Sequence, residues 1–183
     1  MRRTEFIRNF LCALLLIIIV ACTTEAKTSK SGNIASLFAR VNPSLGTKKA
    51  QDYATVVVHA GEKFKVDPYV IAALIVHEST VNHKAVSKGG DYGLMQIRWK
   101  VHAKAIKQRF PKVKKASDLF DARTNILYGT EIFSDCMKKA NGSVNGGILR
   151  YSAGNQKLVN KVTNTVNELN GSSKKTVKAK KKK

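Results

Sequence analysis

Residues 67–99 read DPYVIAALIVHESTVNHKAVSKGGDYGLMQIRW, and this stretch decides the fold. Asp67 is a natural helix N-cap, and Pro68 suits the first helical position, where a missing N–H costs nothing. Val70–Val76 is apolar on every face, which predicts a helix that is buried all round rather than amphipathic. A glycine-containing turn follows, and Ser87–Ile97 supplies at most a small hairpin.

Glu78 lies at the C-terminal end of this predicted helix, about 16 Å from its N-cap at the helical rise. Two effects disfavour the ionised form of its carboxyl group there: desolvation by the core and the negative end of the helix dipole. Both raise its pKa from about 4.3 toward the range in which a carboxylic acid still donates a proton near neutral pH. We therefore expect Glu78 to be a general acid that faces the polar loop after the helix.

Four motifs occur in one order along the chain, and together they cover about residues 66–162. They are Glu78-Ser79, Gly93-Leu94-Met95-Gln96, FDARTNILYGTEIF (Phe120–Phe133) and ILRYSAGN (Ile148–Asn155). This set resembles the catalytic domain of lytic transglycosylases of the soluble-lytic-transglycosylase (SLT) type. The resemblance implies a mainly α, lysozyme-like single domain with at most a small β-hairpin near the active site.

The resemblance also implies a reaction on peptidoglycan, at the β-1,4 bond between N-acetylmuramic acid and N-acetylglucosamine. Glu78 would protonate the leaving oxygen and then accept the proton of the C6 hydroxyl of the same muramoyl sugar. That hydroxyl would close on C1 and form a 1,6-anhydro product without water. The N-acetyl group would stand in for the second carboxylate of most glycosidases. No cofactor is expected.

Other positions match substrate-binding residues of the family. The resemblance places Ser87 near the acid and the acetamido group, Gln96 on the glycan, and the Tyr151 hydroxyl close to the catalytic carboxyl. Ser87 as a turn residue and Tyr151 as a core aromatic are the alternatives. Further residues expected at the substrate site are Met95, Asn125 on the cleft floor, Ser79 orienting the loop, and Arg98.

The residues after Ile97 depart from the family pattern, which continues with an apolar residue and Pro. Arg98 and Trp99 follow instead. Arg98 is expected to pair with peptide-stem carboxylates, while Trp99 either packs in the core or stacks on a sugar ring. These changes concern subsite preference more than the chemistry.

Two alternative functions are compatible with the sequence, whereas a zinc site is not. A muramidase on the same fold would use Asp91 to activate water; a non-catalytic, basic wall-binding protein would not depend on Glu78. The pair His77-Glu78 would need a second His at position 81 to form a zinc-protease motif, but that residue is Val81.

The N-terminal residues resemble an export signal. Residues 1–21 combine a basic start with a short apolar run and are predicted to be a signal peptide. The run ends at Cys22 in a sequence that resembles a bacterial lipobox, which implies lipidation of Cys22 and residues 22–32 as a flexible tether. We expect an outer-membrane lipoprotein facing the periplasm. Cleavage near Ala26, giving a soluble periplasmic protein, is the alternative.

Residues 33–170 are expected to form the domain, with a core large enough for independent folding. Helical patterns fall at Ile34–Val41, Lys48–Phe64, Pro68–Glu78, Val101–Phe110, Ala122–Ala140, Val144–Tyr151 and Gln156–Leu169. Asn170-Gly171 is a predicted stop signal. Cys136 is expected on an apolar face as a buried small hydrophobe without a disulfide partner.

The formal net charge is +21, and residues 171–183 contain seven lysines and no acid. This tail is predicted to be disordered. It is either simply solvated or attached to anionic lipid, lipopolysaccharide or wall polymer, an attraction that salt would weaken. Nucleic acid is not an expected partner, because no aromatic platform or base-reading motif accompanies the lysines.

Overall fold

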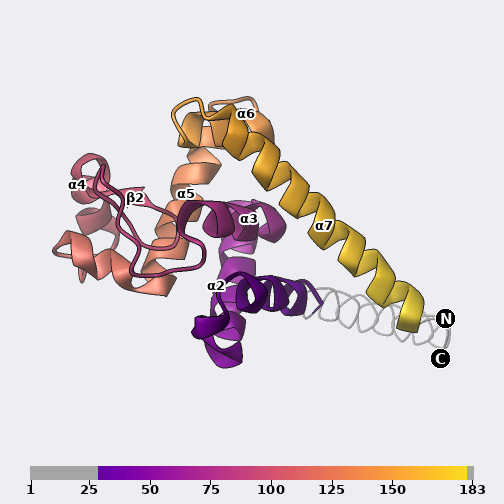
Figure 1. The fold of residues 1–183 in the computed structure, drawn as a ribbon. Coiled ribbons are helices and arrows are strands. Elements are labelled where there is room, and N and C mark those ends of the chain that lie inside the picture. The colour runs from indigo at the N-terminus through magenta and orange to yellow at the C-terminus, as the bar shows by residue number, and fades with distance from the viewer. Residues whose placement is uncertain (1–28, 181–183) are drawn as a thin grey trace, which may run out of the picture.

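The apolar stretch forms helix α3 (Pro68–Ser79), which lies at the centre of the molecule (Figure 1). The computed structural model describes residues 29–180, with side chains as far as Gly171. The Asp67 carboxylate caps α3 by accepting a hydrogen bond of 3.0 Å from the Tyr69 N–H. Each residue from Tyr69 to Val76 is buried, so the prediction of a helix buried on every face is confirmed.

The other helices cover α3 from several sides. Residues 29–41 are helical. The remaining helical elements are η1 (Pro43–Leu45), α2 (Thr47–Phe64), α4 (Trp99–Arg109), η2 (Ala116–Phe120), α5 (Ala122–Lys138), α6 (Val144–Tyr151) and α7 (Gln156–Lys180). Helices α2 and α7 pack on α3, while α5 packs on α2 and α6. Figure 1 shows α7 as a long rod that leaves α6 and passes beside α3.

Within residues 29–180, the β-structure consists of one two-stranded antiparallel sheet. Strand β1 (Asp91–Tyr92) pairs with β2 (Ile97–Arg98), and Asp91 lies opposite Arg98. The intervening turn places Gly93 at φ 78° and Gln96 at φ 47°, so both adopt the left-handed backbone conformation. The small hairpin expected over Ser87–Ile97 is therefore confirmed, and it extends one residue further.

Two apolar clusters hold these elements together. The larger surrounds α3 and includes residues of α2, α5, α6 and α7. The smaller lies under the hairpin and α4 and consists of Ile97, Ile106, Val113, Leu119 and Tyr128. Trp99 packs against the smaller cluster, and the Lys107 ammonium lies 5.5 Å from the centre of its indole ring. This packing supports the prediction that Trp99 is a core residue rather than one that stacks on a sugar ring.

The structure corrects both predicted boundaries of the domain. Residues 29–32, expected in a flexible tether, belong to the first helix, where Ser31 accepts a hydrogen bond of 2.8 Å from the Gln51 side chain. Helix α7 continues through Asn170-Gly171 to Lys180, so the predicted stop there is wrong. A glycine within a helix costs about 1 kcal/mol and does not by itself end the helix.

The predicted signal peptide (1–21), Cys22 and most of the tether lie outside the described residues. Within residues 29–180, no helix combines the length and the apolar character needed to cross a bilayer.

Candidate active site

A cleft of about 1050 Å³ lies at the C-terminal end of α3. Its lining residues come from α3, from the hairpin and from helices α4 to α7. The structure brings five of the residues predicted from sequence to this cleft: Glu78, Ser87, Gln96, Arg98 and Tyr151. Asp91, the residue of the muramidase alternative, also lines it. These side chains come from parts of the chain separated by up to 73 positions, and only the fold brings them together.

Glu78 has the properties expected of a general acid. Burial, followed by the negative charge of Asp91, raises the pKa of Glu78 to about 7. Desolvation was expected from the apolar helix, whereas the contribution of Asp91 follows from the hairpin geometry and was not predicted. A substantial fraction of Glu78 is therefore protonated at neutral pH and able to donate a proton.

Asp91 is held in the opposite state by its neighbours on the hairpin. Arg98 donates two hydrogen bonds to it, from Nε to Oδ1 over 2.6 Å and from Nη2 to Oδ2 over 3.0 Å. Ser87 Oγ donates a third, of 2.7 Å, to Oδ2. The hydrogen bond from Arg98 is the largest influence, and it lowers the pKa of Asp91. The cleft thus contains Glu78, whose pKa is raised to about 7, beside Asp91, whose pKa is lowered.

This pairing also changes the expected role of Arg98. Its guanidinium was expected to meet peptide-stem carboxylates, but it is engaged by Asp91 across the hairpin. The ion pair joins the two strands directly, because Asp91 and Arg98 are register partners. In the described structure, Arg98 therefore positions Asp91.

Ser87 organises the turn that it begins. Its Oγ accepts hydrogen bonds of 3.1 Å from the N–H groups of Gly89 and Asp91, in addition to donating to the Asp91 carboxylate. The turn interpretation of Ser87 is therefore supported. Ser87 lines the same cleft as Glu78, although no hydrogen bond joins the two side chains among the described residues.

Gln96 reaches the cleft from a strained backbone position. Its side-chain NH₂ donates hydrogen bonds to the carbonyls of Gly93 (2.9 Å) and Ala85 (3.3 Å), which fixes the carboxamide at the cleft wall. A left-handed φ of 47° is uncommon for a residue with a side chain, and such strain is frequent at functional sites.

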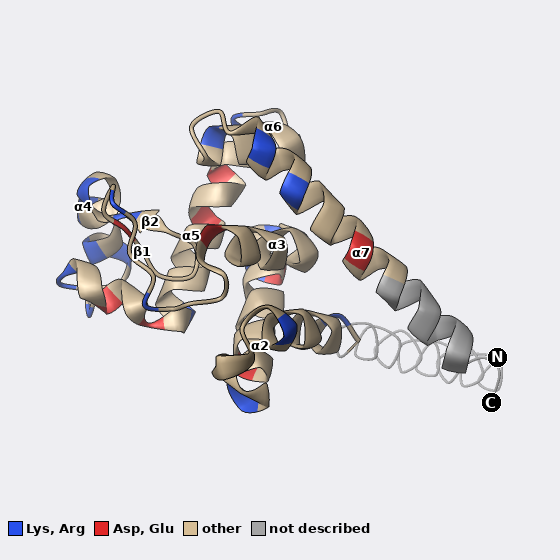
Figure 2. Ribbon diagram, in the orientation of Figure 1, with Lys and Arg blue, Asp and Glu red and all other residues tan. Residues whose placement is uncertain are grey.

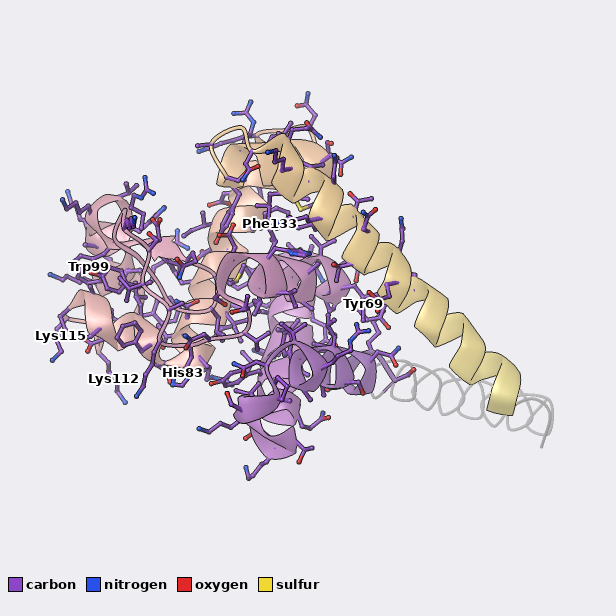
Figure 3. The ribbon with its side chains drawn as sticks, viewed as in Figure 1. Tyr69, His83, Trp99, Lys112, Lys115 and Phe133 are labelled. Carbon is purple, nitrogen blue, oxygen red and sulfur yellow. The ribbon has the colours of Figure 1, made fainter. Side chains whose placement is uncertain are left out.

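Tyr151 closes the cleft on the α6 side. Its hydroxyl donates a hydrogen bond of 2.6 Å to the Met95 carbonyl, and its ring packs edge-on against Phe133, which is labelled in Figure 3. Burial and then the charge of Glu78 raise the pKa of Tyr151 well above its usual value. The phenol is therefore neutral and electrostatically coupled to Glu78, while its hydrogen bond goes to the hairpin turn.

Asn125 does not line the cleft, and the prediction of a cleft-floor residue is wrong. Its side chain is completely buried beneath the hairpin. The carboxamide oxygen accepts a hydrogen bond of 2.8 Å from the Met95 N–H. The carboxamide nitrogen donates to the carbonyls of Tyr92 and Leu119, at 2.9 Å each. Asn125 thus holds the Gly93–Gln96 turn in place through hydrogen bonds, so this polar residue of the motif has a structural role.

Met95 and Ser79 also lie outside the cleft lining. Met95 is completely buried, and a Cβ on Gly129 would lie 2.6 Å from its sulfur, so α5 and the hairpin turn approach closely here. The Ser79 hydroxyl donates to the Ile75 carbonyl over 3.0 Å within α3. Met95 was expected at the substrate and Ser79 was expected to orient the loop, but both side chains are used within the fold.

Several cleft residues were missed because no motif marks them. They lie on helices α3 to α7 or, for Lys139, directly after α5, and they include His77, His102, Arg109, Lys139, Arg150, Lys157 and Lys161. Cys136 belongs to the same lining and is half-buried, so its expected place in the apolar core is corrected. One sequence signal could have found two of the missed residues: Lys157 and Lys161 are four residues apart on a predicted helix, which places both cations on the same helix face.

Across residues 29–180, no group of three or more His, Cys, Asp or Glu side chains is placed to hold a metal ion.

The fold and cleft agree with comparisons to known proteins. The transglycosylase SLT domain family matches residues 55–173, and the chain belongs to this family. Its mainly helical, lysozyme-like architecture with a small sheet is the one expected from the resemblance.

Curated relatives share part of the chain. An endo-type membrane-bound lytic murein transglycosylase A of Klebsiella pneumoniae is 33% identical over 98 residues, which are 51% of this chain and 47% of the relative. The membrane-bound lytic murein transglycosylase E of Buchnera aphidicola is 29% identical over 104 residues, 56% of this chain and 47% of the relative. The membrane-bound lytic murein transglycosylase C of Serratia proteamaculans is 33% identical over 114 residues, 61% of this chain and 32% of the relative. The chain therefore spans about half the length of these relatives or less.

Proposed function

We propose that this protein is a peptidoglycan lytic transglycosylase in which Glu78 is the single catalytic acid and base. The substrate is the bond between N-acetylmuramic acid and N-acetylglucosamine, and the product carries a 1,6-anhydro ring. One observation carries the proposal: a single cleft carboxyl group, Glu78, has its pKa raised to about 7 within an SLT-family fold.

The state of Asp91 favours this reaction over hydrolysis. Oδ1 of Asp91 accepts from Arg98, and Oδ2 accepts from both Arg98 and Ser87. A muramidase would need this carboxylate to activate or orient a water molecule, whereas both of its oxygens are already engaged by the hairpin. Asp91 instead acts on Glu78 through its charge, which helps to keep the proton on Glu78.

The proton can complete a cycle on Glu78 alone. The Glu78 carboxyl donates its proton to the glycosidic oxygen, and the C1–O bond breaks with its electron pair on the leaving sugar. The C6 hydroxyl of the muramoyl sugar then forms a bond to C1, and its proton returns to the Glu78 carboxylate. No water is consumed, and the enzyme ends in its starting state. The acid–base transfers contribute about 10²–10⁴-fold, and binding and distortion of the sugar supply the rest.

Mass spectrometry of the products tests the proposal. The full chain, kept in detergent, is incubated with purified sacculi beside Glu78→Gln and Asp135→Asn. Asp135 is the matched control, because its carboxyl group also lines the cleft. The expected products are one water lighter than hydrolysed muropeptides, and they should disappear only with Glu78→Gln. Products with free reducing ends would indicate a muramidase, and no release by any variant would indicate a wall-binding protein.

We also propose a cell-envelope location, with Cys22 as the lipid-bearing residue and the outer membrane as the site. Support comes from the lipobox-like sequence before Cys22 and from relatives whose names describe them as membrane-bound. Membrane fractionation of Cys22→Ser is the test: release of the protein into the soluble fraction is expected, and unchanged membrane association would contradict lipidation.

A further inference from the structure

The cations of the cleft fall into two groups that differ in their partners. On the hairpin and α4 side, Arg98 pairs with Asp91 and Arg109 pairs with Glu131. On the opposite side, we name four exposed residues the basic wall: Lys139, Arg150, Lys157 and Lys161. None of these four forms an ion pair with another described residue. The positive charge of one cleft side is thus neutralised internally, and that of the other side is not.

The basic wall is built by three consecutive helices at one end of the molecule. Lys139 follows α5, Arg150 lies in the last turn of α6, and Lys157 and Lys161 lie on the first turns of α7. Figure 2 shows Lys and Arg gathered on α6 and on the beginning of α7. The carboxylate of Asp135 also lines the cleft and forms an exposed ion pair of 3.0 Å with Lys138, so the four cations of the wall outnumber the acid beside them.

This arrangement has an intrinsic cost for the folded chain. Lys157 and Lys161 are one helical turn apart, and like charges at this spacing repel. Lys157 also lies at the positive end of the α7 dipole, where no acidic residue is present in the first turn. Together, the four cations and the start of α7 give this edge of the cleft an excess of positive charge, which the one lining carboxylate nearby, Asp135, does not balance.

We propose that the basic wall is a binding subsite for the carboxylates of the peptide stems carried by the glycan. This inference rests on the proposed function, since stems are attached to the muramoyl sugars whose bonds are cleaved. A stem near the scissile bond would present free carboxylates within the same cleft that contains Glu78. The chain would therefore prefer glycan that still carries its stems over glycan from which an amidase has removed them.

The chemistry of the wall fits flexible carboxylates better than one fixed anion. Three of the four cations are lysines, whose ammonium groups are mobile point charges rather than rigid bidentate forks. All four are exposed, so their attraction to carboxylates should be weakened by salt. The wall is thus suited to stems whose carboxylates vary in position from one sugar to the next.

The test compares stem-bearing glycan strands with amidase-stripped strands of the same length. The full chain is measured beside a wall variant (Arg150→Gln, Lys157→Gln and Lys161→Gln together) and a matched control (Lys100→Gln, Lys104→Gln and Lys112→Gln). The control removes the same charge from residues that do not line the cleft. Lys112, labelled in Figure 3, lies beyond α4, away from the α6 end.

The readout is the ratio of kcat/KM on the two strands. We expect the preference for stem-bearing strands to fall about tenfold in the wall variant, equivalent to about 1.4 kcal/mol. The control should keep the ratio of the unmodified chain. An equal fall in the control would attribute the effect to net charge and overturn the proposal, as would equal kcat/KM on both strands before any substitution.

A binding measurement separates failure of this inference from failure of the proposed activity. In a Glu78→Gln background, the affinity for each strand is measured by fluorescence anisotropy at low and high salt. Tighter binding of stem-bearing strands, lost with the wall substitutions and with salt, supports the subsite even if no cleavage is seen. Equal affinity for both strands overturns it, whether or not the chain cleaves glycan.

Discussion

The hydroxyl of Tyr151 donates a hydrogen bond of 2.6 Å to the carbonyl of Met95, joining α6 to the hairpin turn. The two residues are 56 positions apart in the chain. Between them they fix both the α6 side of the cleft and the turn that carries Gln96. The contact therefore links the geometry of the cleft to the packing of α5 against α6 rather than to the hairpin alone.

Tyr151→Phe should lower the rate at which muropeptides are released from sacculi about threefold to tenfold. The variant loses the hydrogen bond to the Met95 carbonyl, and a net hydrogen bond is worth about 0.5–1.5 kcal/mol. The pH dependence should barely move, since the phenol is neutral in the pH range of activity. Initial rates on sacculi across a pH series measure both effects. A large shift of the pH profile would mean that Tyr151 carries charge in the reaction, contrary to this structure.

The rate should fall as pH rises through about 7, because the reaction begins from protonated Glu78 and its pKa is about 7. Asp91→Asn removes the negative charge that raises this pKa, so the falling limb should move to lower pH. The anhydro products should persist. The measurement is kcat/KM between about pH 4 and pH 9 for the unmodified chain and the variant.

Asp135→Asn is the control for this profile, because Asp135 lines the cleft without being a cause of the Glu78 pKa shift. If the falling part of the pH profile did not move in Asp91→Asn, the proposed effect of the Asp91 charge on the pKa of Glu78 would be contradicted. Complete loss of activity in Asp91→Asn would favour the muramidase mechanism.

Glu78→Gln should stabilise the protein at high pH. The pKa of Glu78 is raised from 4.5 to about 7 on folding, so the folded state disfavours the ionised carboxylate. Stability is thus fully present below about pH 4.5 and is lost as pH rises toward 7. The variant avoids this loss and should gain up to about 3 kcal/mol at pH 8, with little gain at pH 4.

Urea unfolding at the two pH values measures this difference, with Glu168→Gln as a control at an exposed carboxylate. An equal effect of Glu78→Gln at both pH values would show that the carboxyl is not desolvated in the folded state. A gain in the free energy of unfolding at pH 8 would also show that Glu78 lowers the stability of the folded protein, as expected of a residue kept for its function.

Asn125→Ala should destabilise the fold by about 2–4 kcal/mol, because it leaves the buried backbone groups of Met95, Tyr92 and Leu119 without partners. Thermal unfolding measures the loss. Asn145→Ala, at an exposed position of α6, should change stability by less than about 0.5 kcal/mol. A stable Asn125→Ala variant that has lost activity would instead restore Asn125 to the substrate site.

The helices could be predicted from sequence because their signals are local. Asp67 and Pro68 begin α3, and the apolar run between them and Glu78 fixes its burial. The end of α7 was not predictable from Asn170-Gly171, since a weak breaker is overridden when the helix on either side is favourable. Local patterns thus give the existence of an element more reliably than its last residue.

The sequence could predict that Glu78 and Tyr151 line the cleft, because motif and chemistry coincide at these positions, while their roles in the reaction stay predictions. The site was not predictable where a polar residue serves the fold: nothing in the sequence separates Asn125, completely buried with three hydrogen bonds, from an asparagine that faces substrate. Nor does the sequence show that Arg98 meets Asp91, because that contact depends on the register of two short strands.

The closeness of Gly93 to Asn125 limits how this sequence can change. A Cβ at position 93 would lie 2.2 Å from the Asn125 carboxamide nitrogen, and the backbone there is left-handed at φ 78°. Enlarging Gly93 would press on the carboxamide and also on the Leu119 carbonyl oxygen, which would lie 2.5 Å from the new Cβ. Shortening Asn125 would lose its hydrogen bonds and would still leave the Leu119 carbonyl in the way. A change at one position should therefore not be rescued by a change at the other, and a library that varies either or both positions would sample almost only losses.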